Sequence, residues 1–391
     1  MKCSRCAVDN NLQDRTASNG KCKSCQHPFT FDPKQPTALS TTNTELHFTD
    51  PFFQTALTTI TANESLFFTV KQFYYQMNQR FIRKSHRETG CLINGLIVGG
   101  GFFLFFIFSG LAKVLIPVTI VLLIFALIGF NVYWRTPHVK RKFFSNRKQR
   151  DLPAAPKLVK GWLDAWARNN GPIAKLLPPP PPPTQIIAPA SVNPEVTVYS
   201  FDRLVVTDTP VMAQFLLANN FHFENNCAVL CIDKYPYDLF WTVMKMLRRN
   251  PELKVYAVHD ASPFGVHLVH RLRTEADWFA NQPNVTIYDL GILPRQVLDR
   301  PVFVQQSPES AQAGRNMAQP VLAALDVTEI QWLRDGYFVE LESFAPQALL
   351  RMITMGIARS RDPRAGDSLV PLDQDPHYTG TTMVYVSDSF G

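Results

Sequence analysis

Four cysteines near the start of the chain form the clearest group of residues able to do chemistry. Cys3 and Cys6 are separated by two residues, Cys22 and Cys25 repeat that spacing, and fifteen residues lie between the two pairs. Each C-x2-C turn places two thiolates close together, and two such turns supply the four sulfur ligands that tetrahedral zinc prefers. Because four thiolates leave no open position for water, the sequence predicts one structural zinc ion per chain.

The segment around these cysteines, residues 1–32, resembles zinc ribbons of the transcription-factor and rubredoxin-like type. Disulfides or free thiols are the alternative use of the same cysteines. No apolar leader precedes them, which favours a reducing compartment and therefore zinc. Such ribbons bind nucleic acid in some proteins and other proteins in others. Basic residues beside the cysteines suit either kind of partner: Lys2, Arg5, Lys21 and Lys23.

The C-terminal half, residues 196–360, alternates between runs typical of strands and runs typical of helices. Strands are predicted over 203–206, 228–232, 254–259 and 285–288, and helices over 210–218, 237–249 and 264–273. Such alternation is typical of a mostly parallel sheet covered by helices. We therefore expect an α/β domain in this half of the chain.

Five short segments of this half follow one another in the order of a known family. They are residues 204–208, 233–236, 255–265, 290–292 and 339–342. In that order they resemble the first strand, the K-G-Y-P loop, the D-x-D-P-x-G motif, the L-G-(L/I) and the terminal E-L-E of a Toprim domain. The family is that of topoisomerase VI A subunits and their meiotic double-strand-break relatives. The resemblance covers about residues 200–355 and implies a Toprim-like fold.

The resemblance also implies a metal site, which this chain carries incompletely. Toprim enzymes hold Mg²⁺ with a Glu and a pair of Asp near the cleaved phosphodiester. Here Thr207 stands at the position of the Glu and Ser262 at that of the second Asp, so Asp260 is left with its neighbour Asp208. Because Mg²⁺ needs several oxygen ligands, we expect no catalytic residues and little Mg²⁺ binding.

A Mg²⁺-dependent enzyme acting on phosphodiesters is the alternative for this half. It would use Asp260 together with Asp208 or Asp233. The nucleophilic tyrosine of the family has a faint counterpart in Phe73-Tyr74-Tyr75, where Tyr75 stands at the matching place.

Two long uncharged stretches, residues 89–112 and 114–134, separate the cysteines from the C-terminal half. Each exceeds the ~20 residues that cross the hydrocarbon core as a helix. Lys and Arg are frequent on both flanks, and the positive-inside rule then places both flanks in the cytoplasm. The sequence therefore predicts a transmembrane helical hairpin over 89–134, in a bacterial cytoplasmic membrane, with Lys113 outside and both termini cytoplasmic.

The remaining segments are expected to connect these parts. Residues 51–88 are typical of an amphipathic helical juxtamembrane region, with Phe and Tyr toward lipid and Lys or Arg toward head groups. Residues 33–50 have the composition of a linker, and 135–195 form a basic and then proline-rich linker that includes a short helix over 158–169. Residues 361–391 are expected to form a flexible tail.

Positively and negatively charged residues are unevenly distributed along the chain. Residues 1–150 carry 19 Lys and Arg against 7 Asp and Glu, and the remainder carries 20 against 25. A basic half beside apolar stretches favours anionic lipid head groups first and nucleic acid second, while the acidic half is poorly suited to gripping duplex DNA. We therefore predict a membrane-tethered, non-catalytic adaptor or regulatory protein with a protein partner. A membrane-anchored nucleic-acid-binding protein and the Mg²⁺-dependent enzyme are the alternatives.

Overall fold

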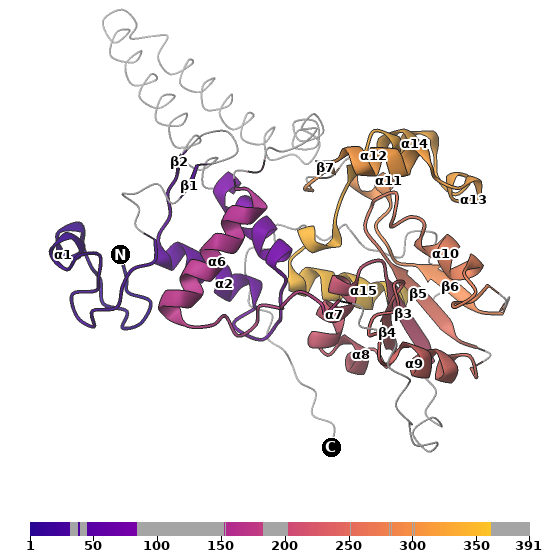
Figure 1. The fold of residues 1–391 in the computed structure, drawn as a ribbon, viewed down its shortest axis with the longest axis horizontal. Coiled ribbons are helices and arrows are strands. Elements are labelled where there is room, and N and C mark those ends of the chain that lie inside the picture. The colour runs from indigo at the N-terminus through magenta and orange to yellow at the C-terminus, as the bar shows by residue number, and fades with distance from the viewer. Residues whose placement is uncertain are drawn as a thin grey trace, which may run out of the picture.

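The computed structural model describes residues 1–31, 38–39, 45–83, 152, 154–182, 202–250, 252–280, 282, 284–298, 300 and 302–360. Three parts follow one another along the molecule (Figure 1). The ribbon, residues 1–31, lies at one end. The helical module, residues 45–83 and 152–182, lies in the middle. The α/β domain, residues 202–360, lies at the other end.

The helical module is built around aromatic side chains. Its helices are α2 (Asp50–Ile60), the helical segment 70–83 and α6 (Pro156–Asn170), and a short antiparallel pair of strands, β1 (Ala38–Leu39) and β2 (Glu45–Leu46), precedes them. Phe53, Phe68 and Phe73 are fully buried, and the rings of Trp162 and Trp166 from α6 pack into the same cluster. Burial of such large apolar surfaces is the main source of stability for a module of this size.

This packing corrects the role predicted for residues 51–88. Their aromatic side chains were expected to face lipid, but they face one another and α6 in a protein core. Even Arg80, expected at lipid head groups, has its guanidinium 4.5 Å above the ring of Phe52. The amphipathic pattern is thus explained by a second helical layer of the same chain.

The predicted fold class also needs correction where it includes a membrane hairpin. In the part of the chain that the structure describes, no helix has both the length and the apolar composition needed to cross a membrane. Residues 89–134, on which the hairpin was placed, lie outside the described residues, as do the linker residues 135–151 and 183–201 and the tail 361–391. The described architecture therefore contains no membrane hairpin. The predicted location in a bacterial cytoplasmic membrane depended on that hairpin and is corrected with it.

The α/β domain contains the expected parallel sheet. Its strands are β3 (Arg203–Thr207), β4 (Ala228–Cys231), β5 (Lys254–Val258) and β6 (Thr286–Asp289), all parallel, in the order β4-β3-β5-β6. Helices alternate with these strands along the chain. They are α7 (Pro210–Ala218) and α8 (Phe221–Glu224) after β3, α9 (Phe240–Leu247) after β4, α10 (Leu268–Thr274) after β5 and α11 (Pro294–Val297) after β6. β3, β4 and β5 are buried almost throughout because helices cover both faces of the sheet.

A further layer, which was not predicted from the sequence, covers one edge of this domain. It contains α12 (Pro308–Arg315), α13 (Gln319–Leu322) and α14 (Val327–Arg334), with the short antiparallel strands β7 (Gln305–Gln306) and β8 (Tyr337–Phe338). Gly314 lets α12 approach α14 closely, since a Cβ there would lie 2.2 Å from the Leu333 carbonyl oxygen. The chain then forms a 3-10 turn (Leu341–Ser343) and α15 (Pro346–Arg359), whose apolar side packs into the main core.

The helical module and the α/β domain share side chains across their boundary. Phe303 of the α/β domain is buried in the aromatic cluster of the module, and Leu177 of the module is buried in the core of the α/β domain. The Asn219 side chain accepts a hydrogen bond from the Phe67 N–H at 2.8 Å and donates one to the Phe67 carbonyl at 3.2 Å. These contacts fix the two parts to each other.

Candidate functional site

The two C-x2-C turns of the ribbon are closed by the same backbone contacts. In the first turn, the Cys3 N–H donates to the Val8 carbonyl and the Ala7 N–H donates to the Cys3 carbonyl, both at 3.0 Å. The second turn repeats these contacts nineteen positions later, at 2.9 and 3.0 Å. The residue after each second cysteine has a left-handed backbone, with φ of 59° at Ala7 and 57° at Gln26. The ribbon is therefore a pair of matching knuckles.

These knuckles bring the four predicted cysteines together. The Sγ atoms of Cys3 and Cys25 are 3.7 Å apart, those of Cys6 and Cys22 are 3.6 Å apart, and all four lie within 4.8 Å of one another. Sulfurs at the corners of a tetrahedron with metal–sulfur bonds of ~2.3 Å are ~3.8 Å apart. The four cysteines can therefore hold a metal ion, and no second cluster of three or more such ligands this tight occurs among the described residues.

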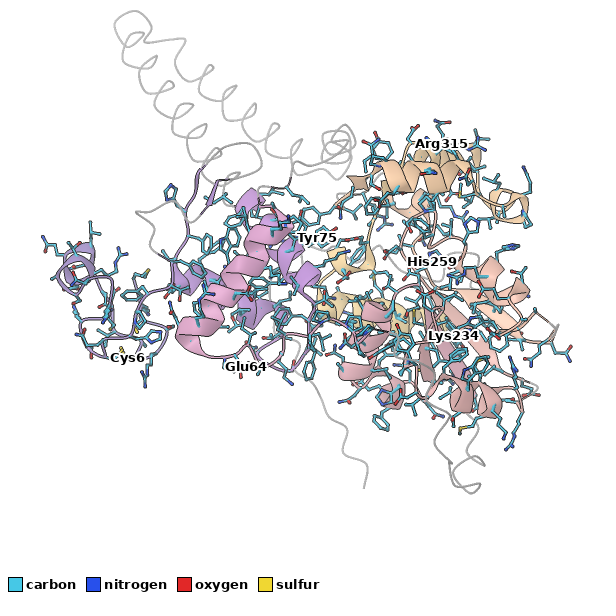
Figure 2. The ribbon with its side chains drawn as sticks, in the orientation of Figure 1. Cys6, Glu64, Tyr75, Lys234, His259 and Arg315 are labelled. Carbon is cyan, nitrogen blue, oxygen red and sulfur yellow. The ribbon has the colours of Figure 1, made fainter. Side chains whose placement is uncertain are left out.

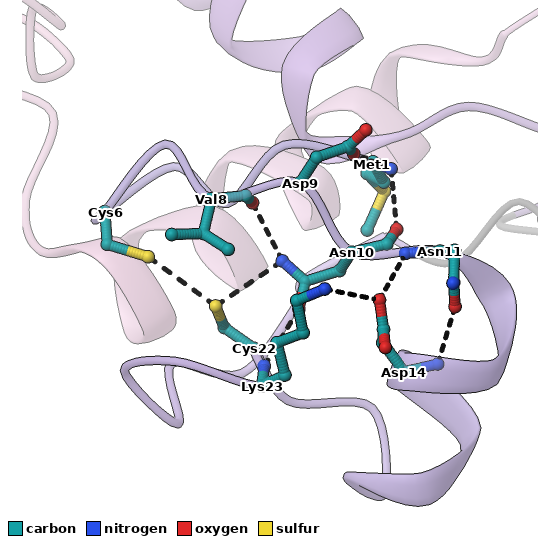
Figure 3. A network of polar contacts seen from close by, with 9 residues as sticks. All are labelled: Met1, Cys6, Val8, Asp9, Asn10, Asn11, Asp14, Cys22 and Lys23. Carbon is teal, nitrogen blue, oxygen red and sulfur yellow. Dashed lines mark hydrogen bonds and ion pairs between the residues drawn. The ribbon is translucent and has the colours of Figure 1, made fainter.

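Asn10 connects the two knuckles from within, as Figure 3 shows. Its side chain is fully buried, and its amide nitrogen donates to the Val8 carbonyl at 2.8 Å and to the Cys22 sulfur at 3.4 Å. Its amide oxygen accepts from the Lys23 N–H at 2.8 Å. Burial disfavours the Cys22 thiolate, but N–H groups of the knuckle and the Asn10 amide outweigh it and lower the pKa of Cys22 to about 6.

The ribbon is attached to the helical module by polar contacts. The Ser4 hydroxyl donates to the Asn170 amide oxygen at 2.8 Å, and the His27 ring nitrogen Nε2 lies 3.0 Å from the same oxygen. The buried Asp50 carboxylate accepts from the Phe31 N–H at 2.7 Å, and burial raises the pKa of this carboxyl group. The two cysteine knuckles thus have a fixed position at the end of α6.

A second candidate site lies at the carboxyl edge of the parallel sheet. Because β4 and β6 lie on opposite sides of the central strands, the strand order reverses between β3 and β5, and ligands of such sheets bind outside the carboxyl ends at that point. Asp208 follows β3 and Asp260 follows β5. The Asp260 N–H donates to Asp208 Oδ2 at 2.9 Å, and the Leu341 N–H donates to Asp260 Oδ1 at 2.6 Å.

A cavity of about 330 Å³ opens at these two aspartates. It lies between the sheet edge and the layer of α12 and β8. Most of its charged lining residues are acidic, so we call it the acidic pocket; the charged and aromatic side chains in it are Asp208, Asp260, Glu309, Glu340, Arg271, Phe264 and Phe338.

The carboxylates at this acidic pocket crowd one another. Burial first, and then the negative charge of Asp208, raise the pKa of Asp260 well above its ordinary value, and burial also raises the pKa values of Asp208 and Glu342. Asp208 Oδ1 is buried and has no hydrogen-bond partner in the described part of the chain. Protons or a bound cation would relieve this repulsion, and such perturbed groups are common at functional sites.

The helical module supplies one cation and two hydroxyls to Glu340, which lines the acidic pocket, and to the nearby Glu342. Lys71 Nζ lies 2.7 Å from Glu340 Oε1 and 3.8 Å from Glu342 Oε2. The Tyr75 hydroxyl donates to Glu340 Oε2 at 2.8 Å, and Figure 2 shows Tyr75 on the side of the module that faces the α/β domain. The Thr69 hydroxyl donates to Glu342 Oε1 at 2.5 Å.

The structure separates the candidate residues that the sequence grouped together. Asp208 and Asp260 meet, but Asp233 is not among the residues that line the cavity, and its carboxylate lies 3.8 Å from the Arg271 guanidinium. Tyr75 reaches the acidic pocket through Glu340, yet its side chain is buried, and burial together with Glu340 raises its pKa. Its phenolate, the nucleophilic form, is therefore disfavoured in this arrangement.

Thr207 and Ser262, which the predicted Toprim resemblance aligns with carboxylates, form local turns. The Thr207 hydroxyl donates to the Thr209 carbonyl at 2.9 Å, and Ser262 Oγ accepts from the Gly265 N–H at 2.9 Å. Glu340 was missed as a site residue, although the E-L-E motif contains it. Lys71 could not be found from its sequence position, because its contact with Glu340 spans 269 residues.

No family model, curated protein or solved structure matches this chain.

Proposed function

We propose that the protein is a divalent-cation-dependent enzyme that acts on phosphodiesters at the acidic pocket. The observation that carries the proposal is the convergence of Asp208 and Asp260 at the point where the strand order reverses, with Asp208 Oδ1 buried and without a hydrogen-bond partner among the described residues. Phosphodiesters are the substrate class that the Toprim resemblance implies. The predicted non-catalytic adaptor becomes the second candidate.

The donor types at the acidic pocket suit a hard cation such as Mg²⁺, although these carboxylates are less tightly grouped than the four cysteines. Asp208, Asp260 and Glu340 line the cavity and offer carboxylate oxygens, the ligands that Mg²⁺ prefers. When bound, such a cation would polarise a phosphoryl oxygen and offset its charge. The residues of the chain position this set: the Leu341 N–H orients Asp260, and Lys71 with Tyr75 orients Glu340.

We propose further that the metal of the ribbon is zinc. Four thiolates at tetrahedral spacing are the ligand set of structural zinc, and all four positions are filled by protein. The role of this ion is to hold two short knuckles together, because the ribbon has little apolar core of its own.

A non-catalytic adaptor is supported by a different observation. Thr207 and Ser262 stand where the family has carboxylates, and both hydroxyls are engaged in turns of the backbone. Tyr75, the counterpart of the family nucleophile, is buried. In this candidate the crowded aspartates are protonated rather than bound to a cation.

Titration of the full chain with Mg²⁺ and with Mn²⁺ separates the two candidates. For the enzyme, calorimetry should detect binding, Asp260→Asn should weaken it about 10-fold or more, and Mn²⁺-dependent hydrolysis of bis(4-nitrophenyl) phosphate should be lost in the same variant. Asn keeps the oxygen that accepts from Leu341, so the fold is preserved. Asp233→Asn, outside the cavity, is the matched control and should behave as the unchanged protein. Absence of cation binding in the unchanged protein would refute the enzyme and leave the adaptor.

A further inference from the structure

Phe264 is an exposed aromatic residue within a buried turn. Its side chain is 67% exposed, whereas residues 261–263 and 265–266 on either side are buried. Leaving a large apolar ring in water has a cost in free energy, and isolated exposed side chains of this kind need no explanation by themselves. What distinguishes Phe264 is its place: it lines the cavity that holds Asp208 and Asp260.

The backbone around Phe264 is held in one conformation. The Ser262 N–H donates to the Asp260 carbonyl at 2.9 Å, and Ser262 Oγ accepts from the Gly265 N–H at 2.9 Å. Gly265 packs so closely that a Cβ there would lie 2.2 Å from the Asp260 carbonyl oxygen. One closed turn therefore holds both Asp260, which lines the pocket, and Phe264, whose ring is exposed.

We propose that Phe264 is a stacking platform for an unpaired base of single-stranded nucleic acid whose phosphodiester enters the acidic pocket. The inference rests on the proposed function and specifies its substrate. A flat aromatic ring beside a site for phosphate matches the two chemical parts of a nucleotide, and base stacking of this kind tolerates any sequence. In a duplex the faces of the bases are covered by their neighbours, so the platform selects unpaired strands.

Charge supports recognition through the base. Residues 151–391 carry 20 Lys and Arg against 25 Asp and Glu, so this half of the chain cannot hold a strand by phosphate contacts alone. Arg271 is the cation in the lining of the cavity, and its side chain is 40% exposed. Stacking on Phe264 supplies affinity that does not depend on phosphate neutralisation.

The test compares oligonucleotides with and without bases, using the full chain. A labelled thymidine 12-mer and the same strand with abasic central positions are titrated by fluorescence anisotropy, once with Ca²⁺ and once with EDTA. Phe264→Ala should weaken binding of the thymidine strand about 5- to 100-fold and leave the abasic strand unaffected. Phe264→Trp, which keeps an aromatic face, should retain binding.

Phe223 provides the matched control. It is 77% exposed on α8, away from the residues that line the cavity, so Phe223→Ala should bind as the unchanged protein does. Equal binding of both strands by the unchanged protein, absence of binding, or equal binding by Phe264→Ala would overturn the stacking proposal. Mg²⁺ titration of Phe264→Ala tells the two proposals apart, because the cation should still bind when the platform is lost.

Discussion

At the scale of single residues, His259 explains how carboxylates can crowd together at the sheet edge. It is fully buried at the end of β5, and Figure 2 shows it beneath the layer of α12 and α14. Its Nδ1 lies 2.8 Å from the Asp260 carbonyl oxygen and its Nε2 lies 3.0 Å from Asp289 Oδ1. The second contact is an ion pair between a fully buried imidazole and a carboxylate that is about one-third exposed.

Both neighbours of the His259 ring are acceptors, so the charged imidazolium suits the position. Burial lowers the pKa of His259, but Asp289 and then the Asp260 carbonyl and Asp208 outweigh burial and raise it to about 9. Gly291 leaves the space for this ring, since a Cβ there would lie 2.2 Å from it. The imidazolium in turn holds down the pKa of Asp208, against the larger effect of burial.

The stability of the protein should therefore depend on pH through His259. Because its pKa is higher in the folded chain than the ~6.5 of an unfolded histidine, the contribution is complete below pH ~6.5 and is lost as pH rises through about 9. Urea unfolding at pH 6 and pH 9 measures it. His259→Gln should lower stability at pH 6 and remove this part of the pH dependence. An unchanged difference between the two pH values in His259→Gln would contradict the assignment.

At the scale of elements, sequence patterns located the strands well, and burial explains this for β3, β4 and β5 but not for β6, whose residues are exposed or half-buried. The predicted runs match β3, β4, β5 and β6 to within one residue at each end, and continuous apolar runs of this length suit strands covered on both faces. The helix predicted from residue 264 begins at Leu268, because Ser262 and Gly265 close a turn first. Helix α9 likewise begins at Phe240 rather than residue 237.

The sequence could not show what covers an apolar helix face. The pattern of residues 51–83 predicts helices with one apolar side, but lipid and a second protein layer produce the same pattern. Likewise, Asp208 and Asp260 could be paired only through a family resemblance, while the contacts of Glu340 with Lys71 and Tyr75 join positions more than 260 residues apart. Local spacing carries no information about such contacts.

The ribbon is the element whose stability should depend on metal. Purified under reducing conditions, the full chain should contain about one zinc ion, measured by mass spectrometry of the metal. Cys22→Ser replaces one thiolate ligand, which also accepts from the Asn10 amide, by a neutral hydroxyl, so zinc content should fall and the ribbon should become sensitive to protease. Cys231→Ala, in β4 of the α/β domain, is the control and should keep its zinc. A chain without zinc would show that the cysteines have another use.

At the scale of the whole molecule, the helical module and the α/β domain are joined by polar and apolar contacts. Thr69, Lys71 and Tyr75 from the module contact Glu340 and Glu342, and apolar side chains cross the boundary in both directions. The C-terminal half on its own would leave these carboxylates without their partners. The acidic pocket is therefore shaped by both parts.

A substitution at Tyr75 measures how much the contacts between the helical module and the α/β domain stabilise the protein. Tyr75→Phe removes a buried hydroxyl that donates to Glu340, which should lower the free energy of unfolding by about 1–3 kcal/mol. Tyr74→Phe is the matched control, because the structure gives no hydrogen bond to the Tyr74 hydroxyl within the described residues, and a change below about 0.5 kcal/mol is expected. Equal effects of the two substitutions in urea unfolding would show that the Tyr75–Glu340 contact does not stabilise the boundary.

The position of the knuckles relative to the cavity sets a lower limit on the size of any shared ligand. The ribbon lies at one end of the molecule and the α/β domain at the other, with the layers of α2 and α6 between them (Figure 1). A ligand that engages both ends at once must extend past the helices α2 and α6, so the module determines how far apart along such a ligand the two contacts fall.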